Sequence, residues 1–281
     1  MTWEENEGNE SGTVKSSSSA PKKNNKVDMK KPLASASAFK PAIEIPATKC
    51  LRMGIYGLPK SGKTHFCLTA KRPIYIIDTE KSAQILVKQL PEEVQREIYI
   101  ADLVDFAEKK GNRMDVVQSL EAAFNIIGDL IDSIENSEHT GTIIIDSMSD
   151  MWEFLLTWLE EQPDLRRARE SGQIMSTERQ RANKRWTQLM RLLQASDWNV
   201  ILTFKAKQKW VGGAPVDVYD ADWQKNTFHW LDLNVEIRRI ADEHHFLIPG
   251  GRFGDKYENQ VNVDFFGLQQ YLTKKSGVKF E

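Results

Sequence analysis

The chain has 281 residues, a length typical of one large domain or two small ones. Its 38 Lys and Arg side chains nearly balance its 40 Asp and Glu side chains, so the net charge is −2. This balance excludes a protein-wide electrostatic attraction for nucleic acid, and any site for nucleic acid must be a local patch.

The cellular compartment is indicated by the absence of three sequence features: a disulfide framework, a membrane span and a signal peptide. Its two cysteines, Cys50 and Cys67, are too few for a disulfide framework or a cysteine metal site, which indicates a reducing, intracellular setting. No apolar run approaches the roughly 18 residues that a membrane span needs, and no signal-peptide hydrophobic region follows the N-terminus. We therefore expect a soluble, cytoplasmic protein without membrane contact.

Residues 1–46 form a low-complexity segment that includes Ser16–Ser19 and the lysine-rich run Lys22–Lys26. Such a segment buries too little apolar surface to offset the chain entropy lost on folding. We predict a disordered tail over 1–46 and a folded domain over 47–281. The tail is either a solvated spacer or a weak nucleic-acid or partner-binding arm.

A phosphate-binding loop is the strongest motif in the chain. The apolar run Met53–Tyr56 indicates a buried strand, and the pattern G-x-x-x-x-G-K-T follows it at once. The glycines let successive N–H groups converge on a phosphate, the lysine reaches the β- and γ-phosphates, and the threonine hydroxyl ligates Mg²⁺. This predicts binding of ATP and Mg²⁺. The predicted nucleotide-binding residues are Gly57, Leu58, Pro59, Lys60, Ser61, Gly62, Lys63, Thr64 and His65.

Four further elements follow in the same α/β pattern. Residues 73–80 indicate a second buried strand that ends in Asp78 and Glu80, and Ile98–Ile100 is a candidate third strand. Apolar residues at three- and four-residue steps predict an amphipathic helix over Met114–Ile134. It leads into a third strongly apolar strand over residues 142–147.

Asp146 lies at the end of that last strand. A carboxylate at the C-terminal end of a strand beside the phosphate loop can hold Mg²⁺ opposite Thr64. The alternative is that Asp146 caps the next predicted helix, Met151–Leu159. The pairing with the phosphate loop favours the metal site.

The second half of the chain contains two basic stretches. Residues 164–185 hold seven Arg and Lys against three Asp and Glu, a local charge of +4. A predicted helix over Trp186–Leu193 and a strand over Asn199–Phe204 lead to a second basic, glycine-bearing stretch, residues 205–215.

The C-terminal part is expected to extend the sheet with antiparallel strands. These are Trp230–Arg239 and His245–Pro249, and a helix over Phe265–Leu272 follows them. The acidic and histidine residues Asp242–His245 could be imagined as a metal cluster, but they are better explained as the hairpin turn between the two strands.

The order of these elements resembles the RecA-like ATPase core rather than an adenylate-kinase-like or Ras-like one. The resemblance covers roughly residues 50–250, and it is nearest to the small core-only members of phages and archaeal viruses that promote single-strand annealing. It implies an α/β fold whose mostly parallel sheet is flanked by helices, with an antiparallel C-terminal extension. For a viral protein the expected location is the host cytoplasm.

The resemblance also implies a general base. In RecA-like enzymes, a glutamate just past the strand after the phosphate loop activates the attacking water, and Glu80 matches it, 17 residues after Lys63. Glu80 and Lys63 are therefore the expected catalytic residues. The alternative is that Glu80 is an acid at the start of a helix before Ser82.

In this family, two mobile loops after the Mg²⁺ strand bind single-stranded DNA, and they correspond here to residues 164–185 and 205–225. The alternative for such charge runs is a solvated face. The γ-phosphate-sensing glutamine has no match, because Thr203–Lys205 occupy its place and the next glutamine is Gln208. The candidate DNA-binding residues are Arg166, Arg167, Arg179, Arg181, Lys205, Lys207, Lys209 and Trp210. Candidates to reach a neighbouring subunit's nucleotide, with ordinary salt bridges as the alternative, are Lys205, Lys207, Arg238 and Arg239.

The expected function is therefore that of a Mg²⁺-dependent ATPase acting on single-stranded DNA in recombination, annealing or replication. The resemblance implies self-association into a ring or filament, with a single-strand-binding protein or other replication factor as a further partner. One alternative is a nucleotide-dependent protein switch or assembly ATPase that binds no DNA. Another is a viral packaging or helicase motor.

Overall fold

A computed structural model describes residues 41, 44, 50–110, 113–134, 140–162, 164–165, 176–253 and 258–280. The chain separates into two units, Met1–Ile45 and Pro46–Glu281, and the second contains all the helices and sheet strands described below. The predicted tail lies outside the described residues, apart from Pro41 and Glu44. Arg166 and Arg167 lie outside them too.

The elements of the folded unit follow in chain order. The strands are β1 (Arg52–Gly57), β2 (Ile74–Asp78), β3 (Ile98–Asp102), β4 (Glu108–Lys110), β5 (Arg113–Asp115), β6 (Thr142–Asp146), β7 (Asn199–Val211), β8 (Ala214–Ala221), β9 (Leu233–Ile240), β10 (Glu243–Gly251) and β11 (Gln260–Val261). The helices are α1 (Lys63–Cys67), α2 (Ala83–Val87), α3 (Glu92–Gln95), α4 (Val117–Ile134), α5 (Met148–Glu160), α7 (Ser176–Ala195) and α8 (Phe265–Ser276). Two 3₁₀ turns are η2 (Leu103–Phe106) and η3 (Thr227–Trp230).

A nine-stranded sheet lies at the centre, in the order β11-β10-β9-β1-β7-β6-β2-β3, with β8 paired to β7 off this path. Neighbouring strands from β9 to β3 run parallel, whereas β10 and β11 are antiparallel. The carboxyl ends of β1, β2 and β6 therefore meet at one edge, level with Lys205 of β7, where ligands of open α/β sheets bind.

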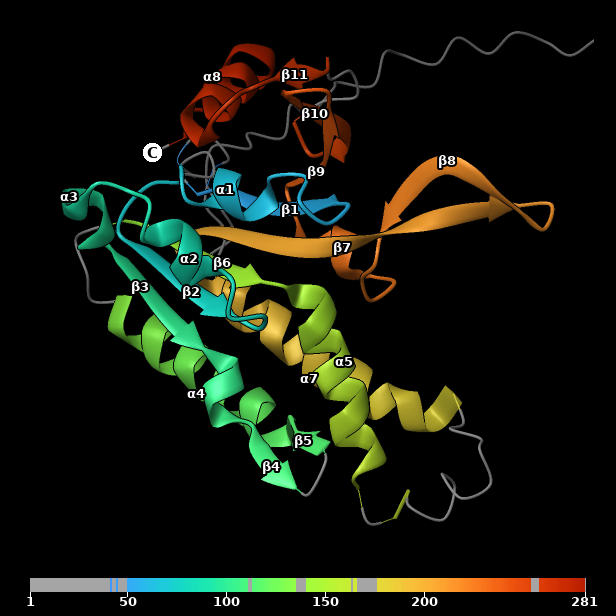
Figure 1. Ribbon diagram of the computed structural model, residues 1–281. Helices are drawn as coiled ribbons and strands as arrows, with labels where there is room; N and C mark the ends of the chain where they lie inside the picture. Colours follow the sequence, from blue (N-terminus) through green and yellow to red (C-terminus); the bar gives the residue numbers. More distant parts are fainter. Residues whose placement is uncertain are drawn as a thin grey trace, which may run out of the picture. The chain divides into compact units, whose positions relative to one another are not determined.

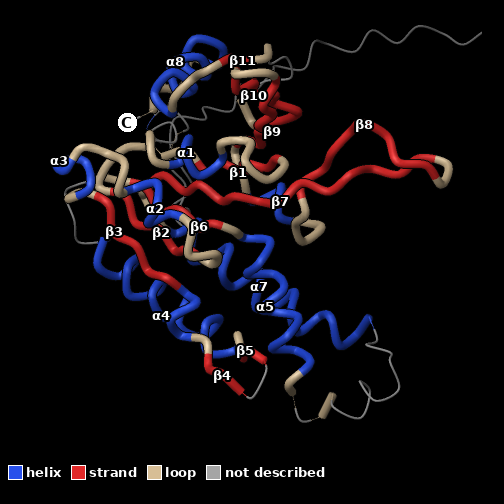
Figure 2. Tube along the Cα trace, viewed as in Figure 1, coloured by secondary structure: helices blue, strands red, loops and turns tan. Residues whose placement is uncertain are grey.

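The two faces of the sheet bury two separate cores, because successive strand residues point to opposite sides. In β6, Ile143 and Ile145 pack with α4, α5 and α7, while Ile144 packs in the core that contains residues of α1, α2 and α8. Figure 2 shows the helices on both sides of the sheet. Since every residue of β6 is buried, its three central residues are all isoleucines rather than alternating with polar residues.

The predicted fold class is confirmed: an α/β core with a mostly parallel sheet, helices on both faces and antiparallel strands at its C-terminal side (Figure 1). Among the described helices, none combines the length and the apolar character that crossing a membrane requires.

Several helix boundaries differ from the sequence-based expectation, and α5 and α7 begin at Met148 and Ser176 rather than at Met151 and Trp186. The helix predicted from Met114 begins at Val117, because residues 113–115 pair with β4 and the Asp115 carboxylate accepts a hydrogen bond from the Val117 N–H. The last helix continues to Ser276. It begins after Asp264, whose side chain accepts from the Gly267 N–H, and it ends at Gly277 in the left-handed conformation.

The predicted mobile loop over 205–225 is wrong. Strand β7 continues to Val211 and turns at Gly212 and Gly213, both with positive φ, into the antiparallel strand β8. We call residues 205–221 the β7–β8 arm, which Figure 1 shows extending away from the sheet. The loop predicted over 164–185 is wrong from Ser176 onward, where α7 has already begun.

The C-terminal extension also needs one correction. The first of its two predicted antiparallel strands, β9, pairs parallel to β1, so the antiparallel part begins only with β10. The predicted hairpin turn between the strands is confirmed, with Ala241 at positive φ.

Candidate nucleotide-binding site

The phosphate loop lies between β1 and α1 and is shaped by its two glycines. At Gly57 a Cβ would lie 2.4 Å from the backbone oxygen of Ile237 and 2.6 Å from the Ser61 hydroxyl oxygen, so no side chain fits. Gly62 has φ +98°, in the region that glycine favours. The loop conformation therefore requires glycine at both positions.

We expect Gly57→Ala to lower the free energy of unfolding by about 1–3 kcal/mol, because the added methyl group meets backbone that cannot move aside. Urea unfolding measures this change. The matched control is Gly128→Ala in α4, where nothing lies within 4 Å of the new Cβ. It should raise the same free energy by about 0.5–1 kcal/mol. Equal stability of the two variants would contradict the predicted loop packing.

Lys63 is the first residue of α1, and its side chain folds over the loop. Its ammonium donates hydrogen bonds to the carbonyl oxygens of Gly57 (2.9 Å) and Leu58 (3.1 Å). Burial lowers the pKa of Lys63, while the carboxylates of Asp146 and Glu80 act in the opposite direction. The charge predicted to meet the phosphates is thus held inside the loop.

The Asp146 carboxylate joins the phosphate loop to the neighbouring strands. The Thr64 hydroxyl donates to Asp146 Oδ2 at 2.6 Å, and the Thr203 hydroxyl donates to Asp146 Oδ1. The strand β6 that carries Asp146 is not directly beside β1, because β7 lies between them. Thr203 comes from this intervening strand, and its hydrogen bond to Asp146 was not predicted from the sequence, which placed Thr203 only at the position of the missing glutamine sensor.

The alternative that Asp146 caps the next helix does not hold. Ser147 occupies that position, and its hydroxyl accepts from the Asp150 N–H. Both Asp146 oxygens are instead directed at hydroxyl groups of β7 and α1.

A magnesium ion suits these side chains. Mg²⁺ prefers oxygen ligands and is usually held by one or two carboxylates together with water and substrate phosphates. Asp146 and Thr64 supply one carboxylate and one hydroxyl within hydrogen-bond distance of each other. Within the described residues, no three His, Cys, Asp or Glu side chains gather into a fuller metal cage.

Glu80 follows β2 at the same edge of the sheet. Its backbone N–H donates to Asp78 Oδ1, while its own carboxylate lies 3.1 Å from the Lys205 ammonium. Burial raises the pKa of Glu80, and the hydrogen bond from Lys205 opposes this shift. The Glu80 carboxylate thus faces the edge where the strand ends meet. Asp78, rather than Glu80, accepts a hydrogen bond from the N–H of Ala83, the first residue of α2.

His244, from β10, is a further residue that the sequence did not indicate. Its Nδ1 lies 2.9 Å from the Ser61 carbonyl oxygen, and a Cβ at Gly62 would approach its ring to 2.7 Å. A cavity of about 200 Å³ beside α1 is lined by His244, His65 and Asn262, among others. His244, which was predicted to belong to a solvated hairpin turn, therefore packs on the phosphate loop.

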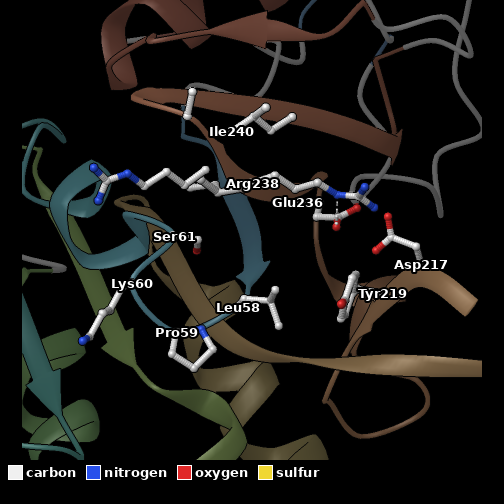
Figure 3. Close-up of a pocket in the computed structure, with 12 residues that line it drawn as sticks. Leu58, Pro59, Lys60, Ser61, Asp217, Tyr219, Glu236, Arg238 and Ile240 are labelled. Atoms are coloured by element: carbon white, nitrogen blue, oxygen red, sulfur yellow. Dashed lines mark hydrogen bonds and ion pairs between the residues drawn. The ribbon is translucent and has the colours of Figure 1, made fainter. Parts of the chain in front are cut away.

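A larger cavity of about 520 Å³ lies on the other side of the loop tip (Figure 3). It is bordered by Leu58–Ser61, by Asp217 and Tyr219 of β8, and by β9, where Arg238 Nε lies 2.6 Å from Glu236 Oε1. Arg238 is therefore engaged within its own chain, as is Arg239, which lies 3.6 Å from Asp242. Both arginines therefore fit the alternative of ordinary salt bridges rather than that of reaching a neighbouring subunit's nucleotide.

The candidate DNA-binding residues are divided between two elements. On the β7–β8 arm, the Trp210 side chain is 67% exposed, whereas Lys207 and Lys209 pair with Asp222 and Asp220 at 3.1 and 3.0 Å. Lys205 lies at the base of the arm and pairs with Asp150 and Glu80. On α7, Arg179 is exposed and Arg181 pairs with Asp164 at 2.7 Å.

The fold and the site together define a phosphate-loop nucleotide-binding protein of the α/β class. A family model described as an AAA domain matches residues 49–249. The chain therefore belongs to this AAA domain family, a family of phosphate-loop ATPases. No curated protein matches the sequence. Among solved structures, the crystal structure of the RadB recombinase is similar, with 12% identity, a TM-score of 0.43 and coverage of 76% of this chain and 87% of that chain.

Proposed function

We propose that the protein binds ATP with Mg²⁺ and hydrolyses it. The observation that carries the proposal is the 2.6 Å hydrogen bond from Thr64 to Asp146, next to the Lys63 ammonium. Lys63 and the loop N–H groups bind the phosphates, and Thr64 and Asp146 hold the metal. Mg²⁺, when bound, neutralises charge on the phosphate oxygens.

Glu80 is the proposed general base. A base must come within hydrogen-bond reach of the water that it deprotonates. Glu80 follows the strand that pairs with β6, in a register that sets Asp78 beside Asp146. This position at the shared edge supports the role, as does the raised pKa of its carboxyl group, because a base works best with a pKa nearer the working pH.

We propose further that the β7–β8 arm contacts single-stranded DNA and that the protein acts as an oligomer in recombination, annealing or replication. The exposed Trp210 offers a stacking surface for bases, and Lys207 and Lys209 lie on the same strand. The exposed Arg179 of α7 adds a further cation.

A protein partner is the second candidate ligand of the arm. Three lysines against two aspartates leave residues 205–221 with a charge of only +1. Trp210 and Val211 are 67% and 65% exposed at its tip, and an exposed apolar tip with paired charges also suits a protein surface. In this case the chain is a nucleotide-dependent switch or assembly ATPase.

Steady-state ATP hydrolysis with and without single-stranded DNA, across a salt series, separates the two candidates. For DNA binding we expect stimulation that falls with salt. Trp210→Ala should weaken DNA affinity about five- to a hundredfold, since stacking contributes about 1–3 kcal/mol per base.

The control is Phe266→Ala on α8, another exposed aromatic side chain, which should leave DNA affinity unchanged. Hydrolysis without any DNA response, at any salt concentration, would contradict the DNA proposal and favour the protein partner. Directional translocation along DNA would instead indicate a motor.

A further inference from the structure

Asp150 in α5 is a buried carboxylate that the proposed reaction does not use. It accepts hydrogen bonds from the hydroxyls of Thr79 (2.9 Å) and Ser147 (2.6 Å) and from the Lys205 ammonium (2.5 Å). Burial by itself raises the pKa of Asp150, but the hydrogen bond from Lys205 and those from the hydroxyls outweigh it and hold the pKa below its usual range. Asp150 is therefore a fixed anion behind the carboxyl edge of the sheet.

Lys205 is held at both ends by the start of α5. Its backbone N–H donates to the Ser149 hydroxyl at 3.0 Å, and its ammonium contacts Asp150. The β1–β7 register places Lys205 opposite Gly57, the first residue of the phosphate loop. The position of its ammonium is therefore determined by the sheet and by α5 rather than by solvent.

The same ammonium lies 3.1 Å from Glu80 Oε1, so Lys205 bridges the two carboxylates. The Glu80 side chain is 48% exposed and follows the end of a strand, so a free glutamate there could adopt several rotamers. Without the cation, Glu80 and Asp150 would face each other as like charges and repel. Glu80 would then turn toward solvent.

We infer that Lys205 is a positioning residue, which holds the Glu80 carboxylate at the carboxyl edge of the sheet for its work as general base. The inference rests on the proposed ATPase function and deepens it. It replaces, for this one lysine, the sequence-based assignment to DNA binding. Lys205 acts through Glu80 and needs no contact with the nucleotide.

The test measures kcat and KM for ATP without DNA, together with the affinity for a fluorescent ATP analogue. Lys205→Met keeps the length and apolar stem of the side chain but removes the charge. We expect kcat to fall about tenfold or more, with KM and analogue affinity within about twofold of wild type. Lys205→Arg should retain most of kcat, and Lys225→Met, an exposed lysine elsewhere, should leave all three values unchanged.

A second variant separates positioning from folding. Lys205→Met leaves Asp150 as an unpaired buried charge, which lowers stability by itself. Lys205→Met/Asp150→Asn removes that charge, and the amide oxygen can still accept the hydroxyl bonds from Thr79 and Ser147. The thermal midpoint should recover in the double variant while kcat stays low. Recovery of kcat together with stability would overturn the inference.

A double-mutant cycle with Glu80→Gln completes the test. If Lys205 acts through Glu80, Lys205→Met should lower kcat little further in the Glu80→Gln background. A full additional loss in that background would overturn the inference. A wild-type protein that binds the analogue but never hydrolyses ATP would instead refute the proposed function, so the two failures are distinguishable.

Discussion

Replacing Lys63 by alanine is expected to lower kcat/KM for ATP roughly a hundred- to a thousandfold, the loss typical of a charge-stabilising donor removed from an active site. Its ammonium lies against the carbonyl oxygens of Gly57 and Leu58, inside the loop whose N–H groups are predicted to bind phosphate. In the proposed reaction Lys205, the cation whose charge acts on Lys63, does not replace it, because the Lys205 ammonium is paired with Asp150 and Glu80.

Steady-state hydrolysis and binding of a fluorescent ATP analogue measure this effect. The matched control is Lys88→Ala, which removes an exposed lysine at the end of α2 and should change neither value. The Lys63 variant should remain folded, since its side chain bonds only to carbonyl groups of the loop in the structure described. A folded Lys63→Ala protein with wild-type turnover would refute the assigned site.

Replacing Asp146 by asparagine should lower Mg²⁺-dependent turnover roughly a hundredfold and raise the Mg²⁺ concentration needed for half-maximal rate. The substitution removes the negative charge but keeps the shape of the side chain. Thr64 and Thr203 now donate to the two carboxylate oxygens, and a threonine hydroxyl can equally accept from an amide N–H. The hydrogen-bonded contacts therefore persist while the metal ligand is weakened.

A Mg²⁺ titration of kcat, together with thermal unfolding of the same protein, checks this prediction. Glu93→Gln removes one exposed carboxylate of α3 and serves as the control for the change in net charge. An unaltered Mg²⁺ dependence in Asp146→Asn would show that the metal is held elsewhere. A large loss of stability would show that Asp146 is mainly a structural acceptor.

The sequence alone was sufficient for the local features of the fold. The apolar runs of β1, β2 and β6 and the periodicity of α4 predicted those elements, because the sequence pattern of a strand or helix depends only on residues near one another in the chain. The phosphate loop was predictable for the same reason: its spacing is a local property of eight consecutive residues. Asp146 and Glu80 could be nominated because each ends a predicted strand.

Errors occurred where strand pairing overrode the local composition. The basic, glycine-bearing residues after Phe204 have the composition of a loop, yet they pair with β8 across the turn at Gly212 and Gly213, where Lys207 and Lys209 form ion pairs with Asp222 and Asp220. The same holds for β9, whose parallel pairing with β1 depends on a segment about 180 residues earlier in the chain.

The sequence by itself therefore determined the phosphate loop, the class of fold and the strand ends that carry candidate ligands. Only the tertiary structure decided which side chains surround them: Thr203 on Asp146, Lys205 between Glu80 and Asp150, and His244 on Gly62. The physical reason is the strand order, because β7 and β9 pair with β1 through residues far apart in the chain and β10 follows β9, and no local pattern encodes that register.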